Sequence, residues 1–258
     1  MITAGVDVGA LSTEVVIMGD GGRLLASSIL PTGANSERAA ERAMREALTQ
    51  AGLRLENLDR IVATGYGRVR VPFAHQQVTE ITCHARGAVY FFPRTRTVID
   101  VGGQDSKVIR VSPRGKPVDF AMNDKCAAGT GRFLEVMARA LEVDLESLGE
   151  LSAQSRNEIT ISSMCTVFAE SEVVSLIAQG TPKEDIIRGL HNSIADRILT
   201  LAHRVGVERE VSMSGGVAKN RGVVRAISEK LGLPLNVPRE PQIVGALGAA
   251  LLALEAED

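Results

Sequence analysis

Apolar residues recur along the chain with two periods, one typical of strands and one typical of helices. Stretches 6–17 and 99–110 each contain two β-branched runs around a glycine-containing turn, which predicts a β-hairpin at both places. Single short runs predict strands at 60–64, 159–162, 210–213 and 235–237. The helical period predicts helices at 36–51, 78–90, 131–141, 167–179, 183–205, 221–231 and 245–254. Ser36 is the expected N-cap of the first helix, and Gly52 is its stop signal.

The two predicted hairpins form an internal repeat. Asp7 and Asp100 end the first run of each copy, and Glu14 and Lys107 occupy equivalent positions in the second run. In both copies a glycine-containing turn follows the aspartate, and a polar turn with glycine follows the second run. A repeat of this kind predicts two structurally related lobes.

Strands that alternate with helices predict an α/β fold. We expect a first lobe over residues 1–95 and a second lobe over residues 96–244. The C-terminal helix, over residues 245–258, is expected to pack back on the first lobe.

Composition narrows the classes of function. The 258 residues carry 29 Lys and Arg against 31 Asp and Glu, and this net charge of −2 favours neither nucleic acid nor an acidic membrane as partner. The chain has no Trp and two Tyr, so it offers little material for stacking on nucleic-acid bases. It opens without a signal-peptide pattern, and no apolar run approaches the length of a membrane span. We expect a cytoplasmic protein.

The hairpin turns combine residue types that bind nucleotide phosphates. Glycines let backbone N–H groups approach phosphate oxygens, and the paired Asp7 and Asp100 can hold a hydrated Mg²⁺ between the lobes. A third glycine-rich element, at 213–220, follows a predicted strand and opens a helix, which suits contact with adenosine and its phosphates. Neither a Walker A pattern nor a complete dinucleotide fingerprint occurs. The expected chemistry is phosphoryl transfer to water in a cleft between the lobes.

The three cysteines are too few and too scattered for a disulfide framework. Cys126 and Cys165 each lie where a loop leads into a predicted helix, and a helix N-terminus favours a thiolate. Two thiolates are half of the ligand set of a cubane iron–sulfur site. Cys83 has no partner at metal-binding spacing and is expected to be a packed helix residue. The histidines also show no paired spacing and are expected at the surface or at caps: His75, His84, His191 and His203.

Four segments resemble the activators of 2-hydroxyacyl-CoA dehydratases, whose motifs are shared by the ATPase subunits of benzoyl-CoA reductases. They read ATGYGR at 63–68, IDVGGQD at 99–105, MNDKCAAGTGRFL at 122–134 and CTVFAESE at 165–172. The similarity runs from residue 5 to residue 252, and the two cysteine segments are its most specific part.

The resemblance implies the ATPase fold shared by actin, sugar kinases and heat-shock chaperones, with two duplicated lobes flanking a nucleotide cleft. It implies a homodimer that shares one 4Fe-4S cluster, to which each subunit gives Cys126 and Cys165. In this family a reduced ferredoxin or flavodoxin loads one electron, and ATP hydrolysis drives its transfer to a dehydratase, which then makes a ketyl radical. The implied cofactors are ATP or ADP, Mg²⁺ and the shared cluster.

The resemblance also assigns roles within the nucleotide site. Gln104 is expected to contact the γ-phosphate or to orient the attacking water, and Asp7 and Asp100 are expected to hold Mg²⁺. Phosphate contacts are expected from Gly9, Ala10, Leu11, Ser12, Thr13, Glu14, Gly102, Gly103 and Asp105. A link between phosphate and cluster is expected from Gly129, Thr130 and Gly131. Contacts to adenosine and its base are expected from Gly215, Gly216, Ala218, Gln242 and Gly245.

The first phosphate hairpin departs from the family pattern at two positions. Ala10 replaces the usual Ser, and Glu14 replaces the usual Lys. Because a carboxylate repels phosphate, phosphate binding here is expected to rest on backbone N–H groups, Ser12 and Thr13. We hypothesise that Glu14 pairs with Lys107 across the cleft.

Three alternatives stay open. The chain is alternatively the electron-activating ATPase subunit of a benzoyl-CoA reductase-type enzyme. A second alternative on the same fold is a sugar-kinase-like phosphotransferase, which requires a catalytic Asp for a bound hydroxyl. A third is a chaperone-like ATPase switch. An oxygen-sensitive, cysteine-bound cluster separates the activator from the last two.

Overall fold

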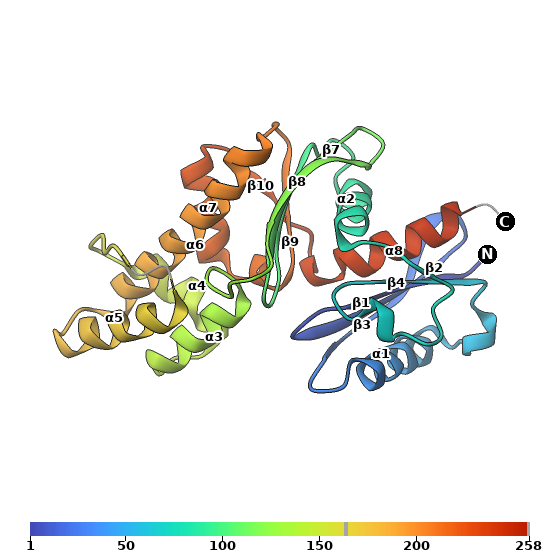
Figure 1. The fold of residues 1–258 in the computed structure, drawn as a ribbon, viewed down its shortest axis with the longest axis horizontal. Helices are drawn as coiled ribbons and strands as arrows, with labels where there is room; N and C mark the ends of the chain where they lie inside the picture. Colours follow the sequence, from blue (N-terminus) through green and yellow to red (C-terminus); the bar gives the residue numbers. More distant parts are fainter. Residues whose placement is uncertain (163–164, 257–258) are drawn as a thin grey trace.

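The computed structural model describes residues 1–162 and 165–256, and Figure 1 shows their arrangement in two lobes. The strands are β1 Thr3–Val8, β2 Ser12–Gly19, β3 Arg23–Pro31, β4 Arg60–Thr64, β5 Gln76–Gln77, β6 Thr97–Val101, β7 Ser106–Val111, β8 Pro117–Asn123, β9 Val211–Ser214 and β10 Leu235–Asn236. The helices are α1 Ser36–Ala51, α2 Glu80–Phe91, α3 Gly131–Ala140, α4 Leu148–Leu151, α5 Thr166–Ala178, α6 Lys183–Val205, α7 Arg221–Leu231 and α8 Val244–Glu255.

Each lobe is built on a five-stranded mixed sheet, and the two sheets share one topology. The first has the order β3-β2-β1-β4-β5, and the second, read from its other edge, has the equivalent order β8-β7-β6-β9-β10. The hairpins β1–β2 and β6–β7 are antiparallel, whereas β4 and β9 run parallel to the first strand of each hairpin. The register places Asp7 opposite Glu14 and Asp100 opposite Lys107. The predicted repeat is therefore confirmed.

Helices cover both faces of both sheets (Figure 1). The first sheet lies between α1, which packs through Ala40, Ala43 and Met44, and α8, which packs through residues such as Ala246 and Leu247. The second sheet lies between α2 on one face and the helices α6 and α7 on the other. In the middle of the molecule α2 and α8 pack against each other. The two lobes are therefore in contact through the helix α8, which covers the first sheet, and the helix α2, which covers the second.

Glycines make the crossing of α2 and α8 unusually close. A Cβ atom on Gly248 of α8 would lie 1.8 Å from the carbonyl oxygen of Cys83 on α2. A Cβ atom on Gly87 of α2 would lie 2.1 Å from the carbonyl oxygen of Val244. A larger side chain at either glycine would collide with a backbone carbonyl group, which cannot move aside as a flexible side chain could.

The C-terminal helix packs on the first sheet, as expected, although residues 257–258 lie outside the described residues. The division of the chain at residue 95 stays a prediction. Helix α2, which precedes it, packs on the second sheet through Ile81, Ala85 and Ala88. None of the helices in the described part of the chain combines the length and apolar character needed to cross a bilayer.

Most predicted elements match the structure to within two residues, and α1, α6, α7 and β4 match at both ends. The N-cap of α1 is Asn35 rather than Ser36, because the Asn35 side chain accepts a hydrogen bond from the Arg38 N–H. Gly52 ends α1 in the left-handed conformation, as expected. The sequence patterns gave no indication of β3 or β8, the outer strands beside the two hairpins.

The predicted strand at 159–162 is wrong. These residues are extended but pair with no strand among the described residues. Ile159 and Ile161 instead pack against α6, where a Cβ on Gly189 would lie 2.6 Å from the Ile159 carbonyl oxygen. The Ser162 N–H donates to the Glu172 carboxylate at 2.9 Å. Alternating burial here reflects packing on a helix rather than a place in a sheet.

Candidate functional site

The tips of the two repeated hairpins meet at the junction between the lobes. In the first turn the Gly9 N–H donates to the Ser12 carbonyl at 2.9 Å, and in the second the Gly102 N–H donates to the Asp105 carbonyl at 3.0 Å. Leu11 packs against the second turn, since a Cβ on Gly103 would lie 2.6 Å from the Leu11 Cγ.

Both tips present exposed residues, and the side chains behind them are buried. Ala10 is exposed in the first turn and Gln104 in the second. Thr13 is buried, and its hydroxyl shares a hydrogen bond with the Thr32 hydroxyl at 2.8 Å. Since this bond holds the Thr13 side chain inside the first lobe, Thr13 is poorly placed to bind phosphate.

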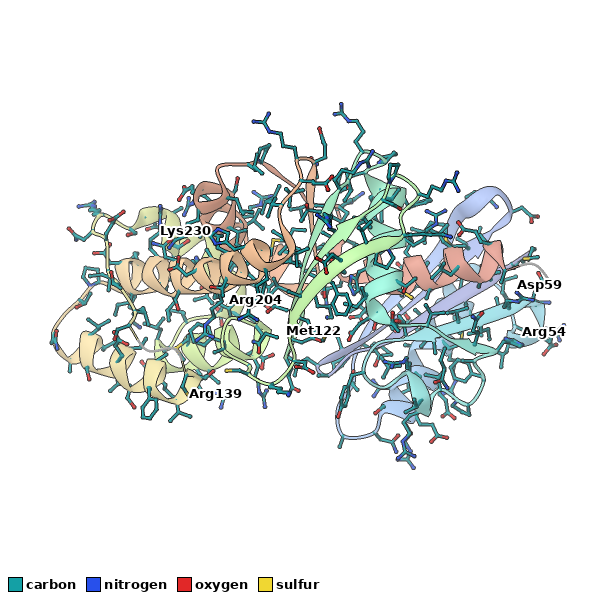
Figure 2. All side chains as sticks on the ribbon, turned by 45° about the horizontal axis from the view of Figure 1, so that its top comes forward. Arg54, Asp59, Met122, Arg139, Arg204 and Lys230 are labelled. Carbon is teal, nitrogen blue, oxygen red and sulfur yellow. The ribbon has the colours of Figure 1, made fainter. Side chains whose placement is uncertain are left out.

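Figure 2 marks Met122, opposite Lys107 in the β7–β8 register, between the two lobes.

Asp7 and Asp100 are both buried at the junction, and their carboxylates flank His84 of α2. His84 Nε2 lies 3.8 Å from Asp7 Oδ2, and His84 Nδ1 lies 3.3 Å from Asp100 Oδ1. His84 Nδ1 also lies 3.1 Å from the Ser214 Oγ, which donates to Asp100 Oδ1 at 2.9 Å. The expected surface or capping role of His84 is therefore wrong, because α2 carries this residue into the centre of the molecule.

The two aspartates differ in their ionisation. Burial raises the pKa of Asp7 to about 6, an effect that His84 only partly offsets. Burial acts in the same direction on Asp100, but His84, Lys107 and the Ser214 hydroxyl outweigh it and lower the pKa to about 2. The second hairpin therefore holds the more firmly ionised carboxylate.

Lys107 is one of the largest fully buried side chains among the described residues. Its ammonium lies 2.9 Å from Asp105 Oδ1, 3.1 Å from Asp100 Oδ2 and 3.4 Å from Glu80 Oε2. Burial disfavours the ammonium, but these carboxylates outweigh it and raise the Lys107 pKa. The hypothesis of a Glu14–Lys107 pair is wrong, because the three carboxylates surround Lys107 and Glu14 is not among its ion-pair partners.

Glu14 occupies the equivalent buried position of the first hairpin. Burial, reinforced by Asp7, raises its pKa well above the ordinary range. Gln242 Nε2 lies 3.4 Å from Glu14 Oε1 and 3.3 Å from Ser12 Oγ. Gln242 also lies beside the third glycine-rich turn, since a Cβ on Gly216 would lie 3.6 Å from its Nε2. This amide therefore connects the first hairpin with the predicted adenosine element.

The third turn approaches Asp100 directly. Gly215 has a φ of +86°, and a Cβ atom there would lie 2.9 Å from Asp100 Oδ1. Its N–H donates to the Pro241 carbonyl, and its own carbonyl accepts from the N–H of the buried Ala218 at 3.1 Å. Gly245 plays a similar part at Asp7, because a Cβ there would lie 2.1 Å from Asp7 Oδ2. Glycine at both positions lets backbone pack on the carboxylates.

The two predicted cluster cysteines are exposed, whereas Cys83 is buried, as expected. Cys165 is the N-cap of α5, and residues 163–164 before it lie outside the described residues. Cys126 lies in the loop between β8 and α3, five residues before the helix begins at Gly131. Helices α3 and α5 contact each other, so both thiols belong to one end of the second lobe.

The loop that carries Cys126 is tied to β8 at its start and to the turn of the second hairpin at its end. Before it, the Asn123 side-chain amide donates to the Cys126 carbonyl at 2.8 Å. After it, the Thr130 hydroxyl donates to the Gly103 carbonyl at 3.0 Å, and the Gly131 N–H donates to the Gly102 carbonyl at 2.9 Å. Gly129, with a φ of +84°, packs on the Arg197 side chain. The segment 129–131 thus joins the second phosphate turn to α3.

Comparisons with known proteins agree with this arrangement. The model of the BadF/BadG/BcrA/BcrD ATPase family matches residues 4–253. The chain is 49% identical to the activator of lactoyl-CoA dehydratase of Anaerotignum propionicum over 99% of this chain and 98% of that protein. The crystal structure of component A of the Acidaminococcus fermentans (R)-2-hydroxyglutaryl-CoA dehydratase is 47% identical, with a TM-score of 0.95 over 99% of this chain and 98% of that chain.

Another similar structure is the activator of the 2-hydroxyisocaproyl-CoA dehydratase from Clostridium difficile with bound ADPNP. It is 46% identical, with a TM-score of 0.94 over 99% of this chain and 95% of that chain. More distantly, a ROK family glucokinase from Streptomyces griseus has a TM-score of 0.62 at 15% identity over 99% of this chain and 100% of that chain, which shows the fold alone. The expected fold, shared by sugar kinases and actin-like ATPases, is confirmed. This chain belongs to the BadF/BadG/BcrA/BcrD ATPase family.

Proposed function

We propose that this ATPase is an iron–sulfur electron-transfer activator that delivers a low-potential electron to a 2-hydroxyacyl-CoA dehydratase. Its relatives support the proposal, since proteins 46–49% identical over nearly the whole chain are named activators of such dehydratases. The observation that carries it is the continuous set of hydrogen bonds from the second phosphate turn, through Thr130 and Gly131, to the helix that follows Cys126.

The junction between the lobes suits a nucleotide with Mg²⁺. Three glycine-containing turns converge there, and Asp7 and Asp100 supply carboxylate oxygens, the ligands that Mg²⁺ prefers. A bound Mg²⁺ neutralises charge on the phosphates during transfer to water. Gln104, exposed at the tip of the second turn, is the residue proposed to contact the γ-phosphate or to orient the attacking water. Adenosine is assigned to Gly215, Gly216, Ala218, Gln242 and Gly245.

The cysteines suit a cluster shared between two copies of the chain. Cys126 and Cys165 are exposed and stand before the adjacent helices α3 and α5. One chain offers two such thiols, so the four ligands of a 4Fe-4S cluster require a homodimer. The cluster supplies a site for one transferable electron. The N-terminal end of α5 would direct backbone N–H groups and its positive dipole end toward the Cys165 thiolate, which would stabilise negative charge.

The face of α5 beside Cys165 supports this assembly. Val167, Phe168 and Val174 are exposed by 65%, 68% and 54%. Exposed apolar side chains at this helical spacing are typical of a protein contact rather than of a solvated face. We assign them to the surface around the shared cluster, where the second subunit and the dehydratase component meet the chain.

Coupling between hydrolysis and electron transfer follows from the bonds of the second turn. Hydrolysis changes the phosphates bound at Gly102, Gly103 and Asp105 and so shifts this turn. The carbonyls of Gly102 and Gly103 then transmit the shift to Thr130 and Gly131. Because α3 begins at Gly131, a shift of this turn reorients the helix and the loop of Cys126. The proposed electron donor is a reduced ferredoxin or flavodoxin, and the acceptor is the dehydratase.

An alternative acceptor is a benzoyl-CoA reductase-type enzyme. A component of the benzoyl-CoA reductase of Thauera aromatica is 34% identical over 97% of this chain and 92% of that protein. The higher identity to the dehydratase activators favours the dehydratase. A sugar-kinase-like phosphotransferase is disfavoured, because similarity to glucokinase is limited to the fold.

The test is anaerobic iron–sulfur reconstitution followed by assays of ATP hydrolysis and dehydratase activation. We expect about four irons per two chains, a broad sulfur-to-iron charge-transfer absorbance, and ATP-dependent activation of a 2-hydroxyacyl-CoA dehydratase. Cys126→Ser and Cys165→Ser should each lose the absorbance, and Cys83→Ser, at a buried thiol, should keep it. A colourless wild-type protein after reconstitution would contradict the proposal.

A further inference from the structure

We propose that His84 is a positioning residue that fixes the aspartates of the two lobes relative to each other during ATP hydrolysis, an inference that rests on the proposed nucleotide site. His84 is 5% exposed and stands between Asp7 of the first hairpin and Asp100 of the second. It belongs to neither hairpin, because α2 brings it to the junction from the segment between them.

The contacts of His84 differ on its two sides. Toward the second lobe, Nδ1 lies within hydrogen-bond distance of both Asp100 Oδ1, at 3.3 Å, and Ser214 Oγ, at 3.1 Å. Toward the first lobe, Nε2 lies 3.8 Å from Asp7 Oδ2, within ion-pair range but beyond a hydrogen bond. The second-lobe contact is therefore the tighter one, and closure of the lobes would shorten the looser one.

On the Asp7 side of His84, helix α8 carries a glycine, which leaves room for the imidazole and the carboxylate. A Cβ on Gly245 would lie 2.1 Å from Asp7 Oδ2 and 2.9 Å from His84 Nε2. Any side chain there would separate the imidazole from the carboxylate. The close crossing of α2 and α8 thus brings a histidine of one helix and a glycine of the other to the same aspartate.

Glu80 extends this polar face of α2 by one helical turn. It lies 3.4 Å from the Lys107 ammonium, which also contacts Asp100. Helix α2 therefore contacts the second hairpin at both Lys107 and Asp100, while its apolar face packs on the same sheet through Ile81 and Ala85. This double attachment makes α2 a rigid support for His84. The position of Asp7 relative to His84 therefore depends on how the two lobes are arranged.

The inference predicts a particular kinetic defect. His84 contacts two carboxylates and the hydroxyl of Ser214, the residue before Gly215, and none of these three contacts is with a residue assigned to phosphate. Its removal should leave nucleotide binding in place and misalign the aspartates in the reacting complex. A misplacement on the order of 1 Å lowers a rate by about a hundredfold, so a loss in kcat without a matching change in KM is expected.

The experiment compares His84→Asn and His84→Gln in the cluster-loaded protein. The shorter amide places a nitrogen near the Nδ1 position, and the longer amide places one near the Nε2 position, so each variant keeps one side of the bridge. We expect kcat for ATP to fall by about tenfold or more in both variants, with KM and the Kd of ADPNP within about threefold of wild type. The matched controls are His203→Asn and His203→Gln, at an exposed residue of α6, with wild-type kcat expected.

A kcat within twofold of wild type in both His84 variants overturns the positioning role. So does a loss explained by a smaller folded fraction, measured by circular dichroism and thermal unfolding. If neither variant folds, Ser214→Ala decides, because Ser214 contacts both His84 and Asp100: a reduced kcat with unchanged Kd supports the role, and wild-type kinetics overturn it. An inactive wild-type protein would overturn the proposed nucleotide site itself, and with it this role.

Discussion

At the scale of single residues, His191 of α6 is buried in the second lobe beside Asn220, the last residue of the third glycine-rich element. It is fully buried, and its Nε2 lies 3.3 Å from the Asn220 side-chain nitrogen. Its Nδ1 has no hydrogen-bond partner among the described residues. Burial, and then the charges of Arg225 and Arg188, lower the His191 pKa to about 3. The expected surface or capping role of His191 is therefore wrong.

This histidine should make the protein acid-labile. Its pKa is about 3 in the folded protein and 6.5 when unperturbed, so below pH 6.5 the unfolded chain binds a proton that the folded chain rejects. Stability contributed by the neutral imidazole is present above pH 6.5 and is lost as the pH falls toward 3. The loss is about 1.4 kcal/mol per pH unit, or about 2–3 kcal/mol at pH 4.5.

Urea unfolding of wild type and His191→Gln at pH 7 and pH 4.5 measures this effect. The variant should lose less free energy of unfolding than wild type between the two pH values. His203→Gln, at an exposed position, should follow wild type. Equal pH dependence in wild type and His191→Gln would contradict the assignment.

The two copies of the repeat differ in charge at the paired positions Glu14 and Lys107. Lys107 in the second hairpin is surrounded by carboxylates, whereas Glu14 in the first is close to an amide and a hydroxyl, with Lys219 only a minor charge influence. His84 lies nearer to Asp100 than to Asp7, and the Lys107 cation also offsets the buried charge of Asp100. This difference explains why the pKa of Asp7 is raised and that of Asp100 is lowered.

At the scale of secondary-structure elements, the connection between the second turn and α3 depends on Thr130. Its buried hydroxyl lies between two acceptors, the carbonyl of Ala127 at 2.5 Å and that of Gly103 at 3.0 Å, and the N–H of Arg132 donates to the Gly103 carbonyl at 2.9 Å. Thr130→Val keeps the shape of the side chain but removes the hydroxyl donor. We expect it to weaken the transmission of nucleotide state to the loop of Cys126, because one bond of the link is lost.

The alkylation rate of the exposed Cys126 thiol in cluster-free protein reports on this transmission. In wild type, ADPNP should change the rate by about threefold or more, a coupling of about 0.7 kcal/mol. Thr130→Val should reduce the change to less than twofold, and Thr130→Ser, which keeps the hydroxyl, should behave as wild type. An undiminished ADPNP effect in Thr130→Val would show that the hydroxyl does not carry the coupling.

At the scale of the whole molecule, helix α5, whose N-cap is Cys165, lies at the end of the second lobe remote from the first lobe (Figure 1), whereas the loop of Cys126 is tied to the second phosphate turn. Helix α5 projects there, and its exposed apolar residues flank Cys165. Motion at the nucleotide site can then reach the cluster only through the second lobe.

This placement predicts that the cluster holds the dimer together. Anaerobic removal of iron with a chelator should convert a dimer to monomers at low micromolar concentration, because four ligand bonds between subunits are lost. Sedimentation velocity before and after chelation measures the change. A dimer that persists without iron, or a cluster-loaded monomer, would contradict the shared site.

The sequence by itself determined the elements of this protein whose signals are local. Helical periodicity placed α1, α6 and α7, the repeated Asp and Gly pattern placed both hairpins, and the motif segments placed Cys126 and Cys165 before helices. Edge strands β3 and β8 were missed, since exposed positions along them weaken the alternation that identifies a strand.

The tertiary structure alone decided how these elements cooperate. The packing of α2 on the second sheet, the partners of Lys107 and the location of His84 all depend on contacts between residues far apart in the chain. A local pattern records which face of a helix is apolar but not which lobe that face will cover. The histidine between the two aspartates was therefore indistinguishable, in sequence, from one at the surface, because only the crossing of the two helices buries it.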